Sequence, residues 1–118
     1  MENTFKGSCH CGAVAYEVTM PAPTSAMVCN CSHCHRKGFM VAFVPREQLT
    51  VHSGTDNLTE YRFNQKKIAH LFCKTCGVQC FGYGTDQEGN ETAAMNLRTF
   101  EDLDTDALEI QKWNGKDF

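Results

Sequence analysis

A seven-residue stretch, CNCSHCH at positions 29–35, holds three cysteines and two histidines. Thiolate sulfur and imidazole nitrogen are the donor groups that zinc binds most often in proteins. Two further cysteine pairs, in CHC at 9–11 and CKTCG at 73–77, have the short spacing typical of metal ligands, and Cys80 stands apart. These residues therefore predict metal chemistry, and their number and spacing limit how many sites they can form.

The chain has eight cysteines in 118 residues. In a secreted protein of this size, such a number would favour disulfides. The first residues, MENTFKGSCH, include no apolar segment of the kind that a signal peptide requires. We therefore expect a cytoplasmic protein whose thiols stay reduced, and clustered reduced cysteines indicate metal binding.

Cys73 and Cys76 have the spacing of a zinc knuckle, in which a tight turn aims two sulfurs at one point. Gly77 offers a backbone position that is free to adopt a positive φ angle just after the turn. The same spacing occurs in thioredoxin-like dithiols, but that motif belongs to a βαβ unit, which this sequence does not show. One knuckle supplies two of the four ligands that a structural zinc requires.

The remaining ligands have to come from the other two cysteine groups. Residues i and i+2 of a strand point to the same face, so Cys9 and Cys11 suit one site, as do Cys29 and Cys31. Cys34 follows three residues later, and a turn can bring it back. Counting ligands gives a closed four-cysteine site and a three-cysteine site with an open position, which is the catalytic pattern. Spacing alone also allows the knuckle to share its metal with Cys29 and Cys31.

Three motifs in this order, GSCHCGAVAYEV, CNCSHCHRKG and FCKTCGVQCFGYG, resemble the glutathione-dependent formaldehyde-activating enzyme family, also called the CENP-V/GFA domain. The resemblance extends from about Gly7 to Asn96. It implies a mainly β, Mss4-like fold of short antiparallel strands stapled by zinc. It also implies that the whole chain, 1–118, forms a single domain of this type.

The resemblance implies a ligand set for two zinc ions. A structural zinc would be held by Cys9, Cys11, Cys73 and Cys76, and a second, catalytic and more labile zinc by Cys29, Cys31 and Cys34. Asn30 stands where many relatives have histidine, and Cys80 matches no ligand of the family. We expect Cys80 to be a buried thiol.

The activity implied by the resemblance is that of a carbon–sulfur lyase. Its substrates would be adducts of an aldehyde with glutathione or another thiol, such as S-hydroxymethylglutathione, so the expected partner is a small thiol. An open position on zinc suits this chemistry, because zinc makes an entering thiol acidic and polarises carbonyl groups. Two other functions stay open, namely a zinc module that binds a protein partner and a protein for thiol redox chemistry or zinc buffering.

The histidines are secondary candidates. His10, His33 and His35 adjoin the cysteines, and we interpret them as ordinary residues, although His33 or His35 could act as a proton shuttle. His52 is expected on the surface, and His70 is interpreted as an ordinary strand residue.

Two short basic segments, at 35–38 and 65–68, are expected to be solvated. A sharper hypothesis is that Arg36, Lys66 or Lys67 meets a carboxylate of glutathione. Six aromatic residues are expected in the core rather than around a substrate: Phe39, Phe43, Phe63, Phe72, Phe81 and Tyr83.

Short strands joined by turns have to position these residues. Hydrophobic residues mostly recur with a period of two, as in 13–20, where Val14, Tyr16 and Val18 share one face. No segment shows three turns of amphipathic helix. The sequence predicts a deeply buried strand at 39–45, a hairpin of 48–54 with 58–63, further strands at 68–73, 79–84, 91–100 and 109–113, and a helical turn within 100–109.

Composition excludes two classes of partner. The formal net charge is −3 and no basic stripe is present, which argues against nucleic-acid binding. The longest apolar run, FMVAFV, is far shorter than a membrane span.

Overall fold

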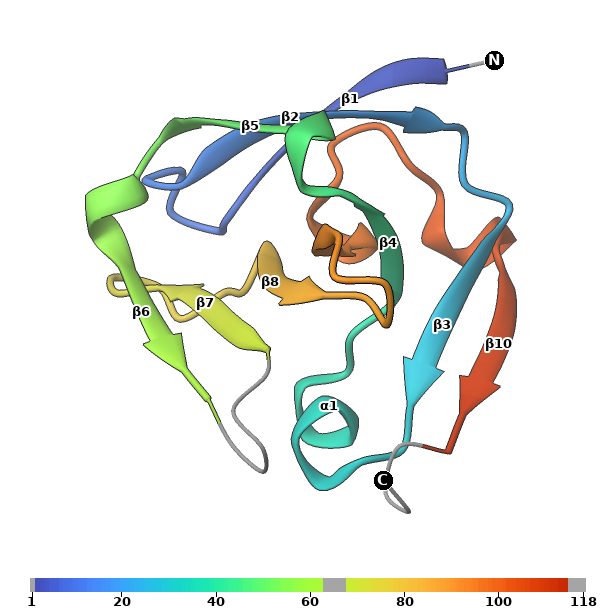
Figure 1. Cartoon of the computed structure of the whole chain (residues 1–118). Helices are drawn as coiled ribbons and strands as arrows, with labels where there is room; N and C mark the ends of the chain where they lie inside the picture. The colour runs from blue at the N-terminus through green and yellow to red at the C-terminus, as the bar shows by residue number, and fades with distance from the viewer. Residues whose placement is uncertain (1, 63–67, 115–118) are drawn as a thin grey trace.

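Two β-sheets make up most of the computed structural model, which describes residues 2–62 and 68–114 (Figure 1). The strands are β1 (Glu2–Ser8), β2 (Ala15–Pro21), β3 (Ser25–Cys29), β4 (Val41–Pro45), β5 (Leu49–Ser53), β6 (Leu58–Tyr61), β7 (Ala69–Cys73), β8 (Phe81–Thr85), β9 (Glu91–Asn96) and β10 (Glu109–Trp113). The smaller sheet has the order β1-β2-β5 and the larger one β10-β3-β4-β9-β8-β7-β6. Every neighbouring pair is antiparallel except β10 with β3. The predicted mainly β class is confirmed.

Tyr16 joins the two sheets through the core. Val14, Tyr16 and Val18 are each at most 1% exposed, whereas the residues between them are half-buried, as the period of two predicts. The Tyr16 ring contacts Phe81 of the larger sheet edge-on, at a centroid distance of 5.9 Å. Gly7 of β1 has to lack a side chain, because a Cβ atom there would overlap the Tyr16 phenol.

The predicted hairpin of 48–54 with 58–63 is wrong. β5 pairs with β2 in the smaller sheet, whereas β6 pairs with β7 in the larger one. The 3-10 turn Thr55–Asn57 therefore carries the chain from one sheet to the other. The chain does turn between the two segments, but β5 pairs with a strand much earlier in the sequence and β6 with the next strand along the chain. Phe63 lies outside the described residues.

Most other predicted strands are present as β2, β7, β8, β9 and β10, and a 3-10 turn at Thr105–Ala107 matches the predicted helical turn. The segment 39–45 differs from its prediction, because strand β4 begins only at Val41 and Phe43 is 54% exposed. Of the other predicted core aromatics, Phe39 and Phe81 are buried, whereas Phe72 and Tyr83 are half-buried.

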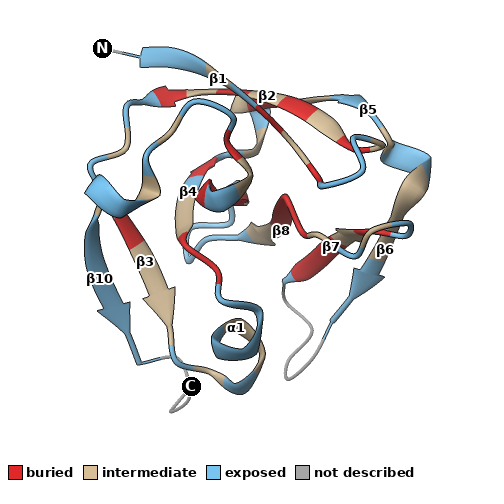
Figure 2. Ribbon diagram, turned by 180° about the vertical axis from the view of Figure 1, so that it is seen from behind, coloured by how far each residue is buried: buried red, intermediate tan, exposed pale blue. Residues whose placement is uncertain are grey.

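The cysteine spacing indicates a strand at Cys29, where β3 ends, but the sequence predicts neither strand β1 nor the helix α1 (Ser32–Lys37). Figure 1 shows α1 between the end of β3 and the strands β6 and β7. Side chains of the helix contact Tyr61 of β6 and Phe72 of β7. Strand β10 is exposed along its whole length at the sheet edge (Figure 2). No helix in residues 2–62 and 68–114 has the length and apolar character needed to cross a bilayer.

Candidate metal centres

Four cysteines from distant parts of the chain form one cluster, which we call the closed cluster: Cys9, Cys11, Cys73 and Cys76. All four Sγ atoms lie within 4.8 Å of one another, and the Cys9–Cys11 and Cys11–Cys73 Sγ–Sγ distances are both 3.7 Å. A tetrahedral zinc with Zn–S bonds of ~2.3 Å separates its sulfurs by about 3.8 Å. The cluster therefore matches the size of a zinc tetrahedron. The knuckle converges with Cys9 and Cys11 rather than with Cys29 and Cys31.

Cys9 and Cys11 do not lie on a strand, which corrects the geometric argument for their convergence. They occupy a tight turn directly after β1, in which the N–H of Gly12 donates to the carbonyl of Cys9 at 3.3 Å. The N–H of Val14 donates to Cys9 Sγ at 3.4 Å. The turn brings both sulfurs to the cluster, with Cys9 buried and Cys11 exposed, and leaves His10 exposed between them.

The knuckle has the turn that its sequence predicts. Gly77 has a φ angle of +81°, and its N–H donates to the carbonyl of Cys73 at 2.9 Å. Backbone N–H groups of Thr75 and Cys76 point at Cys73 Sγ, at 3.3 and 3.5 Å. The side-chain amide of Asn57 donates to the same sulfur at 3.4 Å. Asn57 belongs to the crossing between the sheets, and no motif in the sequence identified it.

These N–H groups stabilise a thiolate in the closed cluster. The N–H of Cys76 is the strongest influence that lowers the pKa of Cys73, to about 6. At Cys11, the N–H of Ala13 lowers the pKa, but burial and the neighbouring thiols outweigh it and raise the pKa to about 11. Thiolates this close repel one another, so a full set of four favours a bound cation.

Three cysteines near one another in the sequence form a second cluster, which we call the open cluster: Cys29, Cys31 and Cys34. Their Sγ atoms also lie within 4.8 Å of one another, and all three residues are half-buried. Cys29 ends β3, Cys31 caps the N-terminus of α1, and Cys34 lies in its first turn. The turn that was expected to bring Cys34 back is thus a short helix.

Backbone N–H groups again point at the sulfurs. The N–H of Cys31 donates to Cys29 Sγ at 3.5 Å, and that of Cys34 donates to Cys31 Sγ at 3.3 Å. Burial opposes ionisation of Cys31, but the N–H of Cys34 and further hydrogen bonds outweigh it and lower the pKa of Cys31. Burial and the neighbouring thiols raise the pKa of Cys34. Cys31 is therefore the thiol of this cluster that ionises before Cys34.

Residues at the end of strand β10 contact the segment from Cys29 to Cys31 of the open cluster. Trp113 of β10 is paired with Cys29 of β3, and its carbonyl accepts from the N–H of Asn30 at 3.1 Å. The side-chain amide of Asn30 donates to the Oδ1 atom of Asn114 at 2.9 Å. These contacts come from the C-terminal part of the chain, and no motif in the sequence predicts them.

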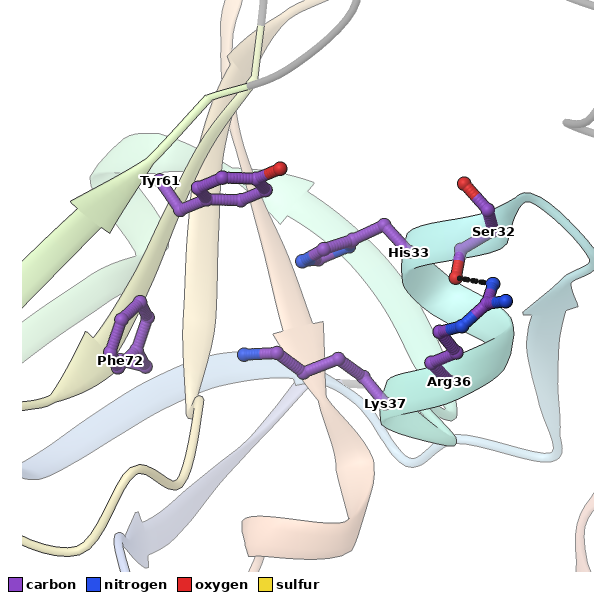
Figure 3. A pocket seen from close by; sticks show the side chains of 6 residues that line it. All are labelled: Ser32, His33, Arg36, Lys37, Tyr61 and Phe72. Atoms are coloured by element: carbon purple, nitrogen blue, oxygen red, sulfur yellow. Dashed lines mark hydrogen bonds between the residues drawn. The ribbon is translucent and has the colours of Figure 1, made fainter.

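A cleft of about 680 Å³ opens beside α1 (Figure 3). Its walls are formed by Ser32, His33, Arg36, Lys37, Tyr61 and Phe72. His33 and Lys37 extend from α1 toward Tyr61 and Phe72 on the larger sheet (Figure 3). His33 Nδ1 lies 3.8 Å from Cys34 Sγ, so the cleft borders the open cluster.

Comparison with known proteins identifies the family. The sequence model of the GFA family, glutathione-dependent formaldehyde-activating enzyme, matches residues 4–115. The chain belongs to this family. A crystal structure of a Rhodobacter sphaeroides protein is similar in fold and sequence, with a TM-score of 0.78 and 32% identity. The match covers 90% of this chain and 99% of that one. The resemblance carried by the three cysteine motifs is thereby confirmed.

Two histidines of this GFA protein have surroundings that the sequence did not predict. His33 is half-buried, and its ring lies 4.2 Å from that of His70, which is only 7% exposed. Burial, helped by His33 and Lys37, lowers the pKa of His70 to about 4, and burial also lowers the pKa of His33. Both rings are therefore neutral at pH 7.

The other predicted residues around the GFA motifs are placed more simply. His35 and His52 are exposed, and Cys80 is a buried thiol, as expected. Burial raises the pKa of Cys80 to about 12, which keeps it protonated. Arg36 lines the cleft. Lys66 and Lys67 lie outside the described residues.

Proposed function

We propose that this GFA-family protein is a zinc-dependent carbon–sulfur lyase that acts on adducts of an aldehyde with glutathione or a related thiol, such as S-hydroxymethylglutathione. The observation that carries the proposal is the contrast between its clusters, one with four sulfurs and one with three sulfurs beside a cleft. A set of four protein ligands is typical of structural zinc, whereas three ligands leave a position for a substrate. We also propose that the chain forms one Mss4-like domain around these two sites.

Both clusters fit zinc by donor type and by size. In the proposal, the first ion is held by Cys9, Cys11, Cys73 and Cys76, and the second by Cys29, Cys31 and Cys34. When bound to the open cluster, zinc would acidify an incoming thiol and polarise a carbonyl oxygen. Backbone N–H groups directed at sulfur in both clusters offset the charge of the thiolates.

Cleavage of the adduct requires that the hydroxyl proton leaves, that the C–S bond breaks and that its electron pair stays on sulfur. The products are the aldehyde and the thiolate, which takes up a proton. His33 suits the proton transfer in this proposal, because it is neutral at pH 7 and stands where the open cluster meets the cleft. A neutral imidazole can accept the hydroxyl proton and return it to sulfur. In the direction of synthesis, the same ring would accept the proton of the thiol and deliver it to the carbonyl oxygen.

A second candidate is a module that binds a protein partner. It is favoured by β10, an exposed edge strand on which Ile110 is 45% and Trp113 49% exposed. A strand at the edge of a sheet with exposed apolar side chains can accept another strand. This candidate predicts no catalysis, so a rate measurement separates the two.

Exchange between formaldehyde, glutathione and their adduct can be followed by NMR with the zinc-loaded protein. We expect exchange well above the uncatalysed rate. Cys31→Ser should reduce it at least ~100-fold, because several kcal/mol of stabilisation depend on the metal. Cys80→Ala is the matched control, since it removes a thiol that belongs to neither cluster. The lyase proposal fails if Cys31→Ser keeps full turnover, or if the wild type accelerates no thiol–aldehyde pair.

A further inference from the structure

Lys37 is held in the cleft beside the open cluster. Its Nζ atom lies 4.7 Å from the centre of the Phe72 ring and 5.7 Å from that of Phe39. It also donates to the Oε1 atom of Gln79 at 3.5 Å. Cation–π contacts and a hydrogen bond therefore fix the position of this ammonium group on the aromatic wall.

The charge of Lys37 is not matched by an acid within the described chain. The six residues that line the cleft include two cations and no aspartate or glutamate. The two ion pairs found in residues 2–62 and 68–114 are His52 with Glu17 and Arg62 with Glu60, so neither involves Lys37. Among the described residues that line the cleft, no carboxylate competes with an entering anion for this ammonium group.

Lys37 rather than Arg36 faces the aromatic side of the cleft. The guanidinium of Arg36 donates to the carbonyl of Ser32 at 3.0 Å, within α1 itself. Figure 3 shows this contact on the side of the helix away from Tyr61 and Phe72, toward which Lys37 extends. The sequence hypothesis named Arg36 as a partner for carboxylate, and the geometry favours its neighbour.

The ammonium group is also close to the open cluster. Residues i and i+3 of a helix are neighbours on its surface, which relates Lys37 to Cys34. Burial lowers the pKa of Lys37, and ionisation of Cys34 would oppose this shift, which places the ammonium group within electrostatic range of that sulfur. A thiol whose sulfur is at the open cluster therefore has the rest of its chain within reach of the cleft.

On the basis of the proposed function, we propose that this cleft selects thiols with a carboxylate several bonds from the sulfur, and that Lys37 binds that carboxylate. Glutathione has two such groups, whereas small neutral thiols have none. The apolar faces of Tyr61 and Phe72 would cover the connecting chain of the thiol. Lys37 is then a residue that determines specificity, and it takes no part in breaking the C–S bond.

The test compares glutathione with its diethyl ester, in which both carboxylates are blocked. Binding of each thiol to the zinc-loaded protein is measured by calorimetry for the wild type, Lys37→Gln and Lys37→Arg. The wild type should bind glutathione about tenfold more tightly than the ester, the size of one charge-assisted hydrogen bond at a partly exposed site. Lys37→Gln should remove this preference, and Lys37→Arg should retain most of it. Lys6→Gln, on the exposed face of β1, is the matched control and should behave like the wild type.

Loss of affinity for both thiols to the same extent in Lys37→Gln would mean that Lys37 supports the structure only, and the inference would be wrong. A wild type without preference for the free carboxylates, or without measurable binding, would also overturn it. Binding is measured without turnover. A carboxylate preference that depends on Lys37 in a protein without lyase activity would thus refute the proposed reaction and support the inference.

Discussion

The closed and open clusters use the same ligand type and differ in how the chain builds them. The closed cluster joins residues 62 positions apart, such as Cys11 and Cys73, and two of its members are at most 3% exposed. The open cluster comes from a stretch between 29 and 34, and its three cysteines are half-buried at the border of a cleft.

The length of chain between the cysteines should decide how much each cluster contributes to stability. A metal that closes a long loop restricts the unfolded chain more than one that closes a short loop. The closed cluster should therefore contribute mainly to folding. The open cluster should contribute less to stability and more to chemistry, because it borders the cleft and lacks a fourth protein ligand.

Cys76→Ser gives the largest expected effect. Zinc binding to structural sites is worth about 10–16 kcal/mol in small zinc domains, which is comparable to the whole stability of a domain of this size. We expect the variant to be largely unfolded at 25 °C by circular dichroism, even with zinc in excess. A cooperative unfolding transition near that of the wild type would contradict the structural role of the closed cluster.

Cys31→Ser should leave the fold nearly intact, which sharpens the comparison. Cys31 caps α1 through its side chain, and serine is a strong N-cap residue, so the helix retains its cap. We expect a melting temperature within a few degrees of that of the wild type. A loss of stability as large as that of Cys76→Ser would show that the clusters do not divide these tasks.

His70, whose ring lies against that of His33 beside the open cluster, should make the folding stability sensitive to acid. Its pKa is about 4 in the folded protein and ~6.5 in an unfolded chain, so the unfolded state binds more protons between these values. Stability is therefore lost as the pH falls from about 6.5 to about 4, by roughly 2–3 kcal/mol from this residue. His70→Gln should unfold with a weaker pH dependence than the wild type in urea titrations between pH 4 and 7. If the free energy of unfolding changed equally with pH in the two proteins, His70 would not titrate in this way.

The smallest effects are expected for two asparagines that lie behind the cysteines, one at each cluster. Asn57 donates directly to a ligand sulfur, and Asn57→Ala should weaken zinc binding at the closed cluster 10–100-fold. The Oδ1 atom of Asn114 accepts from the side chain of Asn30, which is itself no member of the cluster, so Asn114→Ala should weaken zinc binding at the open cluster by less than tenfold. Competition with a chromophoric chelator measures both affinities. A larger loss of zinc affinity in Asn114→Ala than in Asn57→Ala would contradict the expected order.

Local sequence patterns predicted the elements whose signals are complete within a few residues. The turn of Cys73 and Cys76 with Gly77, and the buried face of Val14, Tyr16 and Val18, follow from spacing and periodicity. The convergence of Cys9 and Cys11 was predicted for a strand and occurs in a turn.

The features that escaped prediction depend on distant partners. Strand β5 pairs with β2 from a distant part of the chain, whereas β6 pairs with the next strand, β7, and the local pattern of the two strands does not distinguish these cases. Helix α1 has the sequence SHCHRK and no apolar stripe, so periodicity could not reveal it. His70 has the pattern of an ordinary strand residue, and only the fold brings it against His33.

The most direct test of the division between the clusters is a glutathione titration of the cobalt-substituted protein. Thiolate-to-cobalt charge transfer reports each metal, and Cys31→Ser serves as a protein in which the closed cluster alone is intact. We expect glutathione to change the spectrum or release the metal of the wild type at the open cluster, and to leave the spectrum of Cys31→Ser unchanged. An unresponsive wild type, or an equal response of the variant, would contradict the assignment of the open cluster as the reactive site.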